Sequence, residues 1–152
     1  MSVRQDRQPP EAPDVGWTHI ALPVKEIARS VRFYEEFAAM RVVHERIDQD
    51  TGSHVVWLSD GTRPFVLVLI ESERIDHVLG GVYCHLGVAC SSRAQVDDSC
   101  ARARSLGMRV LGPQDSGPPV GYWAYITDPD GHNLELSYGQ EVGATLRSRA
   151  KG

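Results

Sequence analysis

The sequence has no long apolar run and contains little cysteine. No stretch approaches the roughly 18 consecutive apolar residues that a membrane-spanning helix needs, so we expect no membrane contact. The opening residues, MSVRQDRQPPEAPDVG, lack the apolar centre of a secretory signal peptide. The three cysteines, Cys84, Cys90 and Cys100, have no Cys-x-x-Cys spacing. We therefore expect reduced thiols and a cytoplasmic protein.

An excess of basic residues, typical of nucleic-acid-binding proteins, is also missing. The chain has 16 Lys and Arg against 20 Asp and Glu, a net charge of −4, which disfavours nucleic acid as a partner. Its 152 residues, 41% hydrophobic and 24% charged, have the composition of one globular domain. Polar ends predict a flexible arm over 1–16, a domain over 17–139 and a flexible tail over 140–152.

What the sequence does contain is an internal repeat. WTHIALPV (17–24) aligns with YCHLGVAC (83–90), with an aromatic residue first and a histidine third in both. Further along, AMRVV (39–43) aligns with GMRVL (107–111). Two copies are too few for a solenoid, so we predict two duplicated halves that pack together.

Each half has the same order of strand and helix signals. Alternating apolar residues predict strands, and apolar residues at helical spacing predict one helix per half. In the first half, 17–71, strands are expected at 17–23, 40–47, 54–59 and 65–70, with a helix at 25–38. After a linker at 72–82, the second half, 83–139, has expected strands at 83–89, 108–112, 120–127 and 132–138. Its helix opens with the capping-box sequence of residues 92–95 and ends at Gly107. The order β-α-β-β-β, twice, predicts an α+β fold with helices on one face of a sheet.

Three side chains stand out against this repeat. His19 and His85 hold equivalent places in the two halves, and Glu135 interrupts an otherwise apolar strand. Because alternate strand residues face opposite sides, Glu135 must point away from the face of Leu134 and Leu136. Two imidazoles and one carboxylate can form a facial triad with three open positions, or a zinc site completed by water. We predict a metal site of these three residues. Two alternatives stay open: both histidines could be satisfied core residues, and Glu135 could form a salt bridge with an arginine.

The motifs THIALPV, SVRFYEEF, CHLGVAC and DPDGHNLEL resemble the vicinal oxygen chelate superfamily. This superfamily includes glyoxalase I, extradiol ring-cleaving dioxygenases, methylmalonyl-CoA epimerase, and the fosfomycin and bleomycin resistance proteins. The resemblance covers about residues 17–138. It implies two βαβββ modules forming a curved mixed sheet around one cavity. It also implies metal ligands from the first strand of each half and from the last strand, where this sequence has His19, His85 and Glu135.

The resemblance also points to a position for a fourth ligand. Glyoxalase I and the epimerases take one from the last strand of the first half, which here offers Leu67 or Val68, and neither can ligate. Glu71 lies nearby, at or past the strand end, and is not favoured. Three ligands favour the dioxygenase-like or fosfomycin-resistance-like pattern.

The stretch YITDPDGHNLE matches the Tyr-x-x-Asp-Pro-x-Gly-x-x-x-Glu ending of extradiol dioxygenases. The resemblance therefore implies that Tyr125 acts in acid–base catalysis, although it can equally be an inward-facing strand aromatic. The histidine that precedes this tyrosine in those enzymes is missing. We interpret His54 and His77 as exposed or structural, and His132 as part of a turn.

The resemblance implies a metal-dependent enzyme that acts on a small molecule with two neighbouring oxygens. We favour an extradiol dioxygenase with Fe(II); Mn, Ni, Co or Zn are the other candidate metals. A lactoylglutathione lyase-like isomerase or lyase and a fosfomycin-resistance-like transferase are alternatives. A further alternative is a metal-free, drug-sequestering resistance protein, although such proteins generally lack the His and Glu set. We expect a homodimer, because similar members commonly pair and sometimes share sites across the interface.

Overall fold

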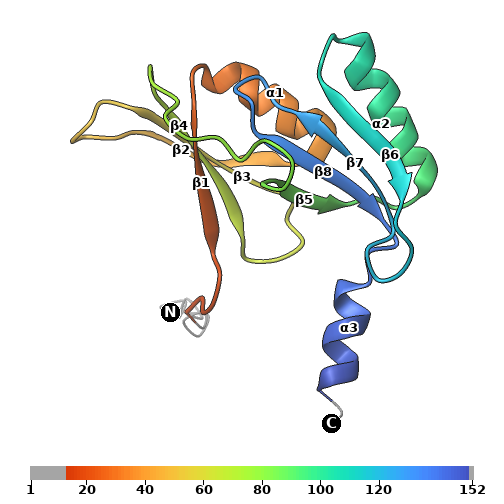
Figure 1. Cartoon of the computed structure of the whole chain (residues 1–152). Helices are drawn as coiled ribbons and strands as arrows, with labels where there is room; N and C mark the ends of the chain where they lie inside the picture. The colour runs from red at the N-terminus through yellow and green to blue at the C-terminus, as the bar shows by residue number, and fades with distance from the viewer. Residues whose placement is uncertain (1–12, 151–152) are drawn as a thin grey trace, which may run out of the picture.

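The structure, a computed structural model, describes residues 13–150 (Figure 1). Most of the predicted N-terminal arm, residues 1–12, lies outside this range. The elements are β1 (His19–Val24), α1 (Ile27–Ala38), β2 (Arg41–Ile47), β3 (His54–Ser59), β4 (Val66–Glu71), β5 (Leu86–Ala89), α2 (Arg93–Ser105), β6 (Val110–Asp115), β7 (Tyr122–Thr127), β8 (Asn133–Tyr138) and α3 (Val142–Arg149). The predicted α+β fold with β-α-β-β-β order in each half is confirmed. Residues 142–149, expected as part of a flexible tail, form the helix α3.

The strands form two separate four-stranded mixed sheets. The first sheet has the order β1-β4-β3-β2 and the second β5-β8-β7-β6. In each sheet the first strand of the module runs parallel to the last, and the remaining pairs are antiparallel. The two modules are therefore copies in topology as well as in sequence.

Helix α1 forms because its apolar residues recur on one face. Ile27, Phe33, Tyr34 and Phe37 are all buried, and the chain leaves the helix at Ala39 in a left-handed conformation with φ 51°. In α2 the predicted cap is present, since the backbone N–H of Gln95 donates to the Ser92 hydroxyl over 3.1 Å. The side chain of Gln95 bonds Ser91 rather than Ser92, so only half of the capping box forms.

Both long helices lie along the same side of the molecule (Figure 1). Helix α1 packs on β2, β3 and β4, and α2 packs on β6, β7 and β8. Their buried side chains belong to one continuous apolar core with Leu67 and Leu69 of the first sheet and Leu134 and Leu136 of the second. The other face of each sheet is left without a helix, and this is where the candidate site residues lie.

The turn before β8 fastens the two modules together. The hydroxyl of Tyr34 in α1 donates to Asp128 Oδ2 over 2.8 Å, and both groups are buried. His132, predicted to be associated with this turn, is fully buried there. Its Nδ1 accepts from the backbone N–H of Leu79 over 3.0 Å, and its Nε2 lies 2.9 Å from the carbonyl oxygen of Pro23. A neutral imidazole satisfies both contacts, and the start of β8 is fixed against β1.

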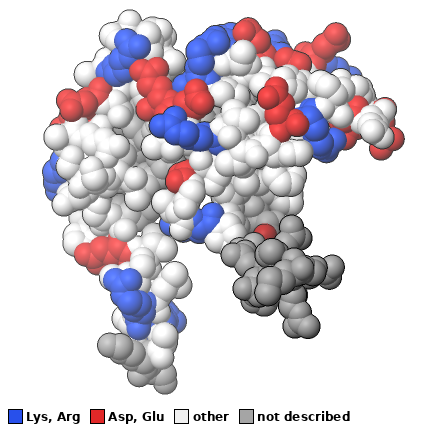
Figure 2. Space-filling model, turned by 180° about the vertical axis from the view of Figure 1, so that it is seen from behind, with Lys and Arg blue, Asp and Glu red and all other residues white. Residues whose placement is uncertain are grey.

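The surface on the helix side carries mixed charges. Figure 2 shows Lys and Arg interspersed with Asp and Glu along this edge, and a largely uncharged surface below it. Among residues 13–150, no helix is both long and apolar enough to span a membrane.

Candidate metal centre

The strand registers superimpose the two modules residue by residue. In the first sheet, a row across the strands runs Ala21, Val68, Trp57, His44. In the second sheet, the matching row runs Gly87, Glu135, Tyr125, Leu111. Ala21 and Gly87 each come two residues after a predicted histidine ligand, His19 or His85. The first-module counterpart of Glu135 is therefore Val68, and the counterpart of Tyr125 is Trp57.

His85 and Glu135 meet on the free face of the second sheet. Nε2 of His85 lies 3.3 Å from Oε2 of Glu135, whose side chain is 8% exposed. On the other side of the ring, Nδ1 of His85 lies 2.7 Å from the carbonyl oxygen of Tyr83. Because a carbonyl can only accept, Nδ1 carries a proton, and Nε2 is the ring nitrogen that faces Glu135. This hydrogen bond fixes the tautomer that a metal-binding histidine needs.

Burial shapes the electrostatics of this pair. Loss of water around the carboxylate raises the pKa of Glu135, while the neighbouring His85 and a hydrogen bond from Gln140 oppose the rise. An isolated buried carboxylate is costly, and ligation of a cation is one of the few ways to compensate that cost. The arginine salt bridge considered as an alternative for Glu135 is absent among the described residues.

Tyr125, the cross-strand neighbour of Glu135, also contacts His85. Its hydroxyl is 3.1 Å from Nδ1 of His85, and the two rings stack with centroids 4.9 Å apart. Trp123 continues the stack at 5.0 Å from Tyr125. Burial, and then the charge of Glu135, raises the pKa of the Tyr125 hydroxyl. The hydroxyl therefore stays protonated and contacts the side of the imidazole that faces away from the candidate metal position.

His19 is not part of this group within one chain. It begins β1 in the other sheet, is exposed, and its Nδ1 lies 3.0 Å from the Thr18 hydroxyl. Over residues 13–150, no three His, Cys, Asp or Glu side chains come together as a metal-binding group. The structure thus brings together two of the three predicted ligands and leaves the third on the equivalent face of the other module.

Glu71, the unfavoured fourth candidate, has a different partner. Although β4 reaches this residue, its Oε1 accepts from the backbone N–H of Ile27 over 3.4 Å at the start of α1. Glu26, at the N-cap position of this helix, makes no side-chain capping bond. Glu71 therefore replaces the missing cap. Two histidines were interpreted as exposed or structural. His54 lies 2.6 Å from Glu45, and His77 is exposed.

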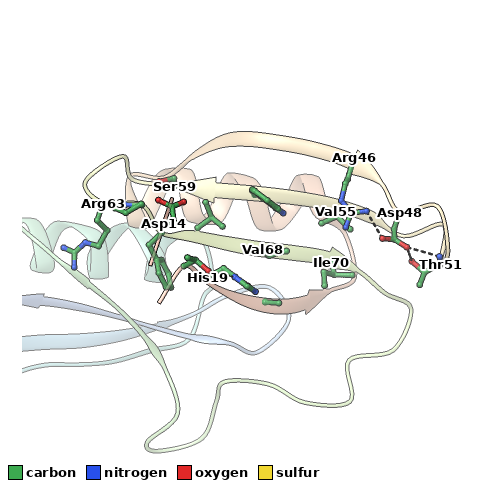
Figure 3. A pocket seen from close by; sticks show the side chains of 16 residues that line it. Asp14, His19, Arg46, Asp48, Thr51, Val55, Ser59, Arg63, Val68 and Ile70 are labelled. Atoms are coloured by element: carbon green, nitrogen blue, oxygen red, sulfur yellow. Dashed lines mark hydrogen bonds and ion pairs between the residues drawn. The ribbon is translucent and has the colours of Figure 1, made fainter. Parts of the chain in front are cut away.

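A pocket of about 720 Å³ lies on the free face of the first sheet, around His19 (Figure 3). All of its lining residues fall between Asp14 and Ile70, so the first module and the segment just before it form the pocket without the second module. The sequence did not single out His44, because the pattern RVVHERI does not indicate which face of the sheet its side chain points to. Its ring lies tilted against that of Trp57, which lines this pocket, with ring centroids 4.9 Å apart.

Comparison with known proteins decides the family. A sequence profile described as the Glyoxalase/Bleomycin resistance protein/Dioxygenase superfamily matches residues 16–136. The chain belongs to this superfamily. An uncharacterized protein of Pseudomonas aeruginosa is 39% identical over 128 residues, which are 83% of this chain and 90% of that protein. A lactoylglutathione lyase of Escherichia coli O157:H7 is 26% identical over 134 residues, covering 84% of this chain and 96% of the lyase.

Solved structures of other proteins share the fold. The fosfomycin resistance protein FosX of Listeria monocytogenes, in complex with Mn(II) and 1S,2S-dihydroxypropylphosphonic acid, superimposes with a TM-score of 0.67 at 20% identity. The match covers 88% of this chain and 99% of FosX. TnmS3, an antibiotic binding protein from a Streptomyces species, has a TM-score of 0.61 at 22% identity, with 84% and 98% coverage. At these identities the likeness establishes the fold alone, and the two proteins that share it are a resistance protein in complex with Mn(II) and an antibiotic binding protein.

Proposed function

We propose that this superfamily member is a metal-dependent enzyme whose site is shared between two protomers. His85 and Glu135 of one protomer supply two ligands, and His19 of the other supplies the third. The observation that supports this most is the pair itself. An imidazole nitrogen and a buried carboxylate oxygen lie 3.3 Å apart, and the other ring nitrogen is hydrogen-bonded to the Tyr83 carbonyl. Because His19 occupies the same place in its module as His85 does, pairing a first module with a second module from another chain completes the set.

The donor set fits a divalent cation. Two imidazoles and one carboxylate leave three positions of an octahedral ion open, which suits Fe(II), with Mn, Ni, Co and Zn as the other candidates. A cation bound there supplies Lewis acidity to a substrate that offers two neighbouring oxygens. The likeness to FosX, which holds Mn(II) beside a molecule with two neighbouring hydroxyls, supports this type of chelation.

Other groups of the protein hold the two ligands in position. Tyr83 holds the His85 tautomer through its carbonyl, and Leu134 and Leu136 anchor the strand that carries Glu135. We propose that Tyr125 is a positioning residue for His85, because its hydroxyl contacts Nδ1 and not the face where the substrate would chelate. This role is an alternative to the acid–base role that the resemblance implies.

The residue at the position of the fourth ligand distinguishes between the candidate reactions. Val68 stands at the position equivalent to Glu135 and cannot ligate. A three-ligand site favours ring cleavage of the extradiol type, with Fe(II), over the lactoylglutathione lyase reaction. The fosfomycin-resistance-like transferase remains the alternative with the same number of protein ligands.

Metal content tests the proposal first. Protein purified without added metal should contain a divalent ion by mass spectrometry, and both His85→Ala and Glu135→Ala should lose it. Glu71→Ala is the matched control, because it removes a nearby carboxylate that caps a helix. If the wild-type protein binds no metal and Glu135→Ala behaves like it, the enzyme proposal is wrong and drug sequestration is favoured.

Substrate panels then separate the reactions. Oxygen uptake with catechols supports ring cleavage, whereas turnover of a glutathione–methylglyoxal adduct supports the lyase and consumption of fosfomycin supports the transferase. Each activity should disappear in Glu135→Ala. Turnover of the glutathione adduct alone would contradict the argument drawn from Val68.

A further inference from the structure

The first module has a histidine, His19, at the place of His85, but it does not have the polar partners that His85 has in the second module. Val68 replaces the acid at the position of Glu135, and Trp57 replaces Tyr125 beside it. Both side chains line the pocket next to His19. The two halves of the site are thus chemically different: one is polar and suited to the cation, and the other is apolar.

The floor of the pocket is made by alternate residues of three strands. Ala21, Val66, Val68 and Ile70 supply aliphatic surface, and Trp57 adds a broad ring that is 39% exposed. His44 contacts this ring from the neighbouring strand in a tilted arrangement, with an angle of 56° between the two planes. A volume of about 720 Å³ is in the range of pockets that hold drug-sized molecules.

The charges around the pocket balance one another. At one end Arg46 donates to Asp48 over 2.7 Å, and this pair has no charge to offer a ligand. Arg63 and Asp14 also line the pocket, toward its other end, with opposite signs (Figure 3). The pocket therefore has no net charge with which to select a charged group.

We propose that the free face of the first sheet is a subsite for a flat, uncharged, apolar group of the substrate, which stacks on Trp57. This deepens the proposed function: the group is the part of the substrate that does not react, held next to His19 while the neighbouring oxygens reach the cation. The substrate is then an apolar, ring-bearing molecule rather than a small phosphonate or a highly charged peptide adduct. Stacking on an oriented aromatic ring and contact with its aliphatic surroundings supply the affinity.

Binding of N-phenyl-1-naphthylamine, a flat uncharged fluorescent probe, tests the subsite in metal-free, full-length protein. We expect saturable binding with one probe per protomer. Trp57→Ala should weaken it about tenfold, or about 1.4 kcal/mol. Trp57→Phe keeps a ring and should retain most of the affinity. Trp17→Ala is the matched control, because Trp17 is 88% exposed and does not line the pocket.

Two further variants sharpen the result. Val68→Glu places a carboxylate in the apolar floor and should also weaken binding of the probe. The probe's anionic analogue, 1-anilinonaphthalene-8-sulfonate, should bind wild type no more tightly than the uncharged probe does. Equal affinity in wild type and a folded Trp57→Ala protein, or a strong preference for the sulfonate, would overturn the subsite. Glu135→Ala should keep probe binding while losing metal. A wild-type protein that binds probe but no metal would contradict the proposed function and leave the subsite standing.

Discussion

The contact between Tyr34 and Asp128 should contribute to the docking between the two modules, in addition to the apolar core that they share. Tyr34→Phe removes one oxygen from a fully buried side chain and leaves the ring in place, so the apolar packing of α1 is preserved. The change breaks the 2.8 Å hydrogen bond to Asp128 Oδ2. Oδ1 of the same carboxylate keeps its bonds from the backbone N–H groups of Asp130 and His132, both at 2.9 Å. The loss is therefore that of one buried hydrogen bond to a charged acceptor.

Such a bond contributes about 1.5–3 kcal/mol, so we expect Tyr34→Phe to lower the free energy of unfolding by about 2 kcal/mol. For a domain of this size that corresponds to a fall in Tm of about 4–8 °C. Burial, and then the charge of Asp128, raises the pKa of Tyr34 well above its usual value. The folded state thus retains the proton longer than the unfolded state does. This stabilisation is complete below about pH 10 and is lost as the pH rises further, so the difference between wild type and variant should shrink there.

Urea unfolding at pH 7, followed by circular dichroism, measures the first effect, and the same titration at rising pH measures the second. Tyr122→Phe is the matched control, because its hydroxyl bonds Asp97 over 2.6 Å at the surface and should cost less than about 1 kcal/mol. If the two variants lose the same stability, or if the Tyr34→Phe difference persists unchanged in strong alkali, the buried contact does not hold the modules as argued.

Three further results are expected. Burial raises the pKa of Glu135, so in metal-free protein the free energy of unfolding falls as the pH rises through that pKa. Glu135→Gln should therefore be more stable than metal-free wild type at pH 7. Chemical unfolding across pH 4–8 checks this, and equal curves for the two proteins would contradict it. Tyr125→Phe should weaken metal binding about tenfold in calorimetry, because it loosens His85; unchanged affinity with reduced turnover would restore an acid–base role. Glu71→Ala should cost about 1 kcal/mol of stability, as loss of the bond to Ile27 at the helix start, with metal content unchanged.

Much of the fold could be predicted because each module is encoded by local periodicity. Alternation gave the strands to within a few residues, and the apolar face of 27–38 gave α1. Helix α3 was missed because residues 142–149 bury no side chain and carry no apolar stripe. The pairing of His85 with Glu135 could be expected from the repeat and from alternation on β8.

The separation of His19 from that pair could not be read from the sequence. Which faces of two duplicated modules meet is decided by a few contacts far apart in the chain, such as the bond of Tyr34 to Asp128 and that of His132 to Pro23. Local sequence patterns do not predict such long-range contacts. The role of Glu71 was hidden for a similar reason, since its partner is a backbone group 44 residues away.

Complementation between two inactive variants tests the shared metal site most directly. His19→Ala and Glu135→Ala should each bind no metal alone, because every site in either dimer lacks one ligand. If subunits are mixed under exchange, each heterodimer should contain one complete site, built from His19 of one chain and His85 and Glu135 of the other. The account predicts recovery of about one quarter of the wild-type metal content after random exchange. No recovery, in mixtures shown to contain heterodimers, would contradict it.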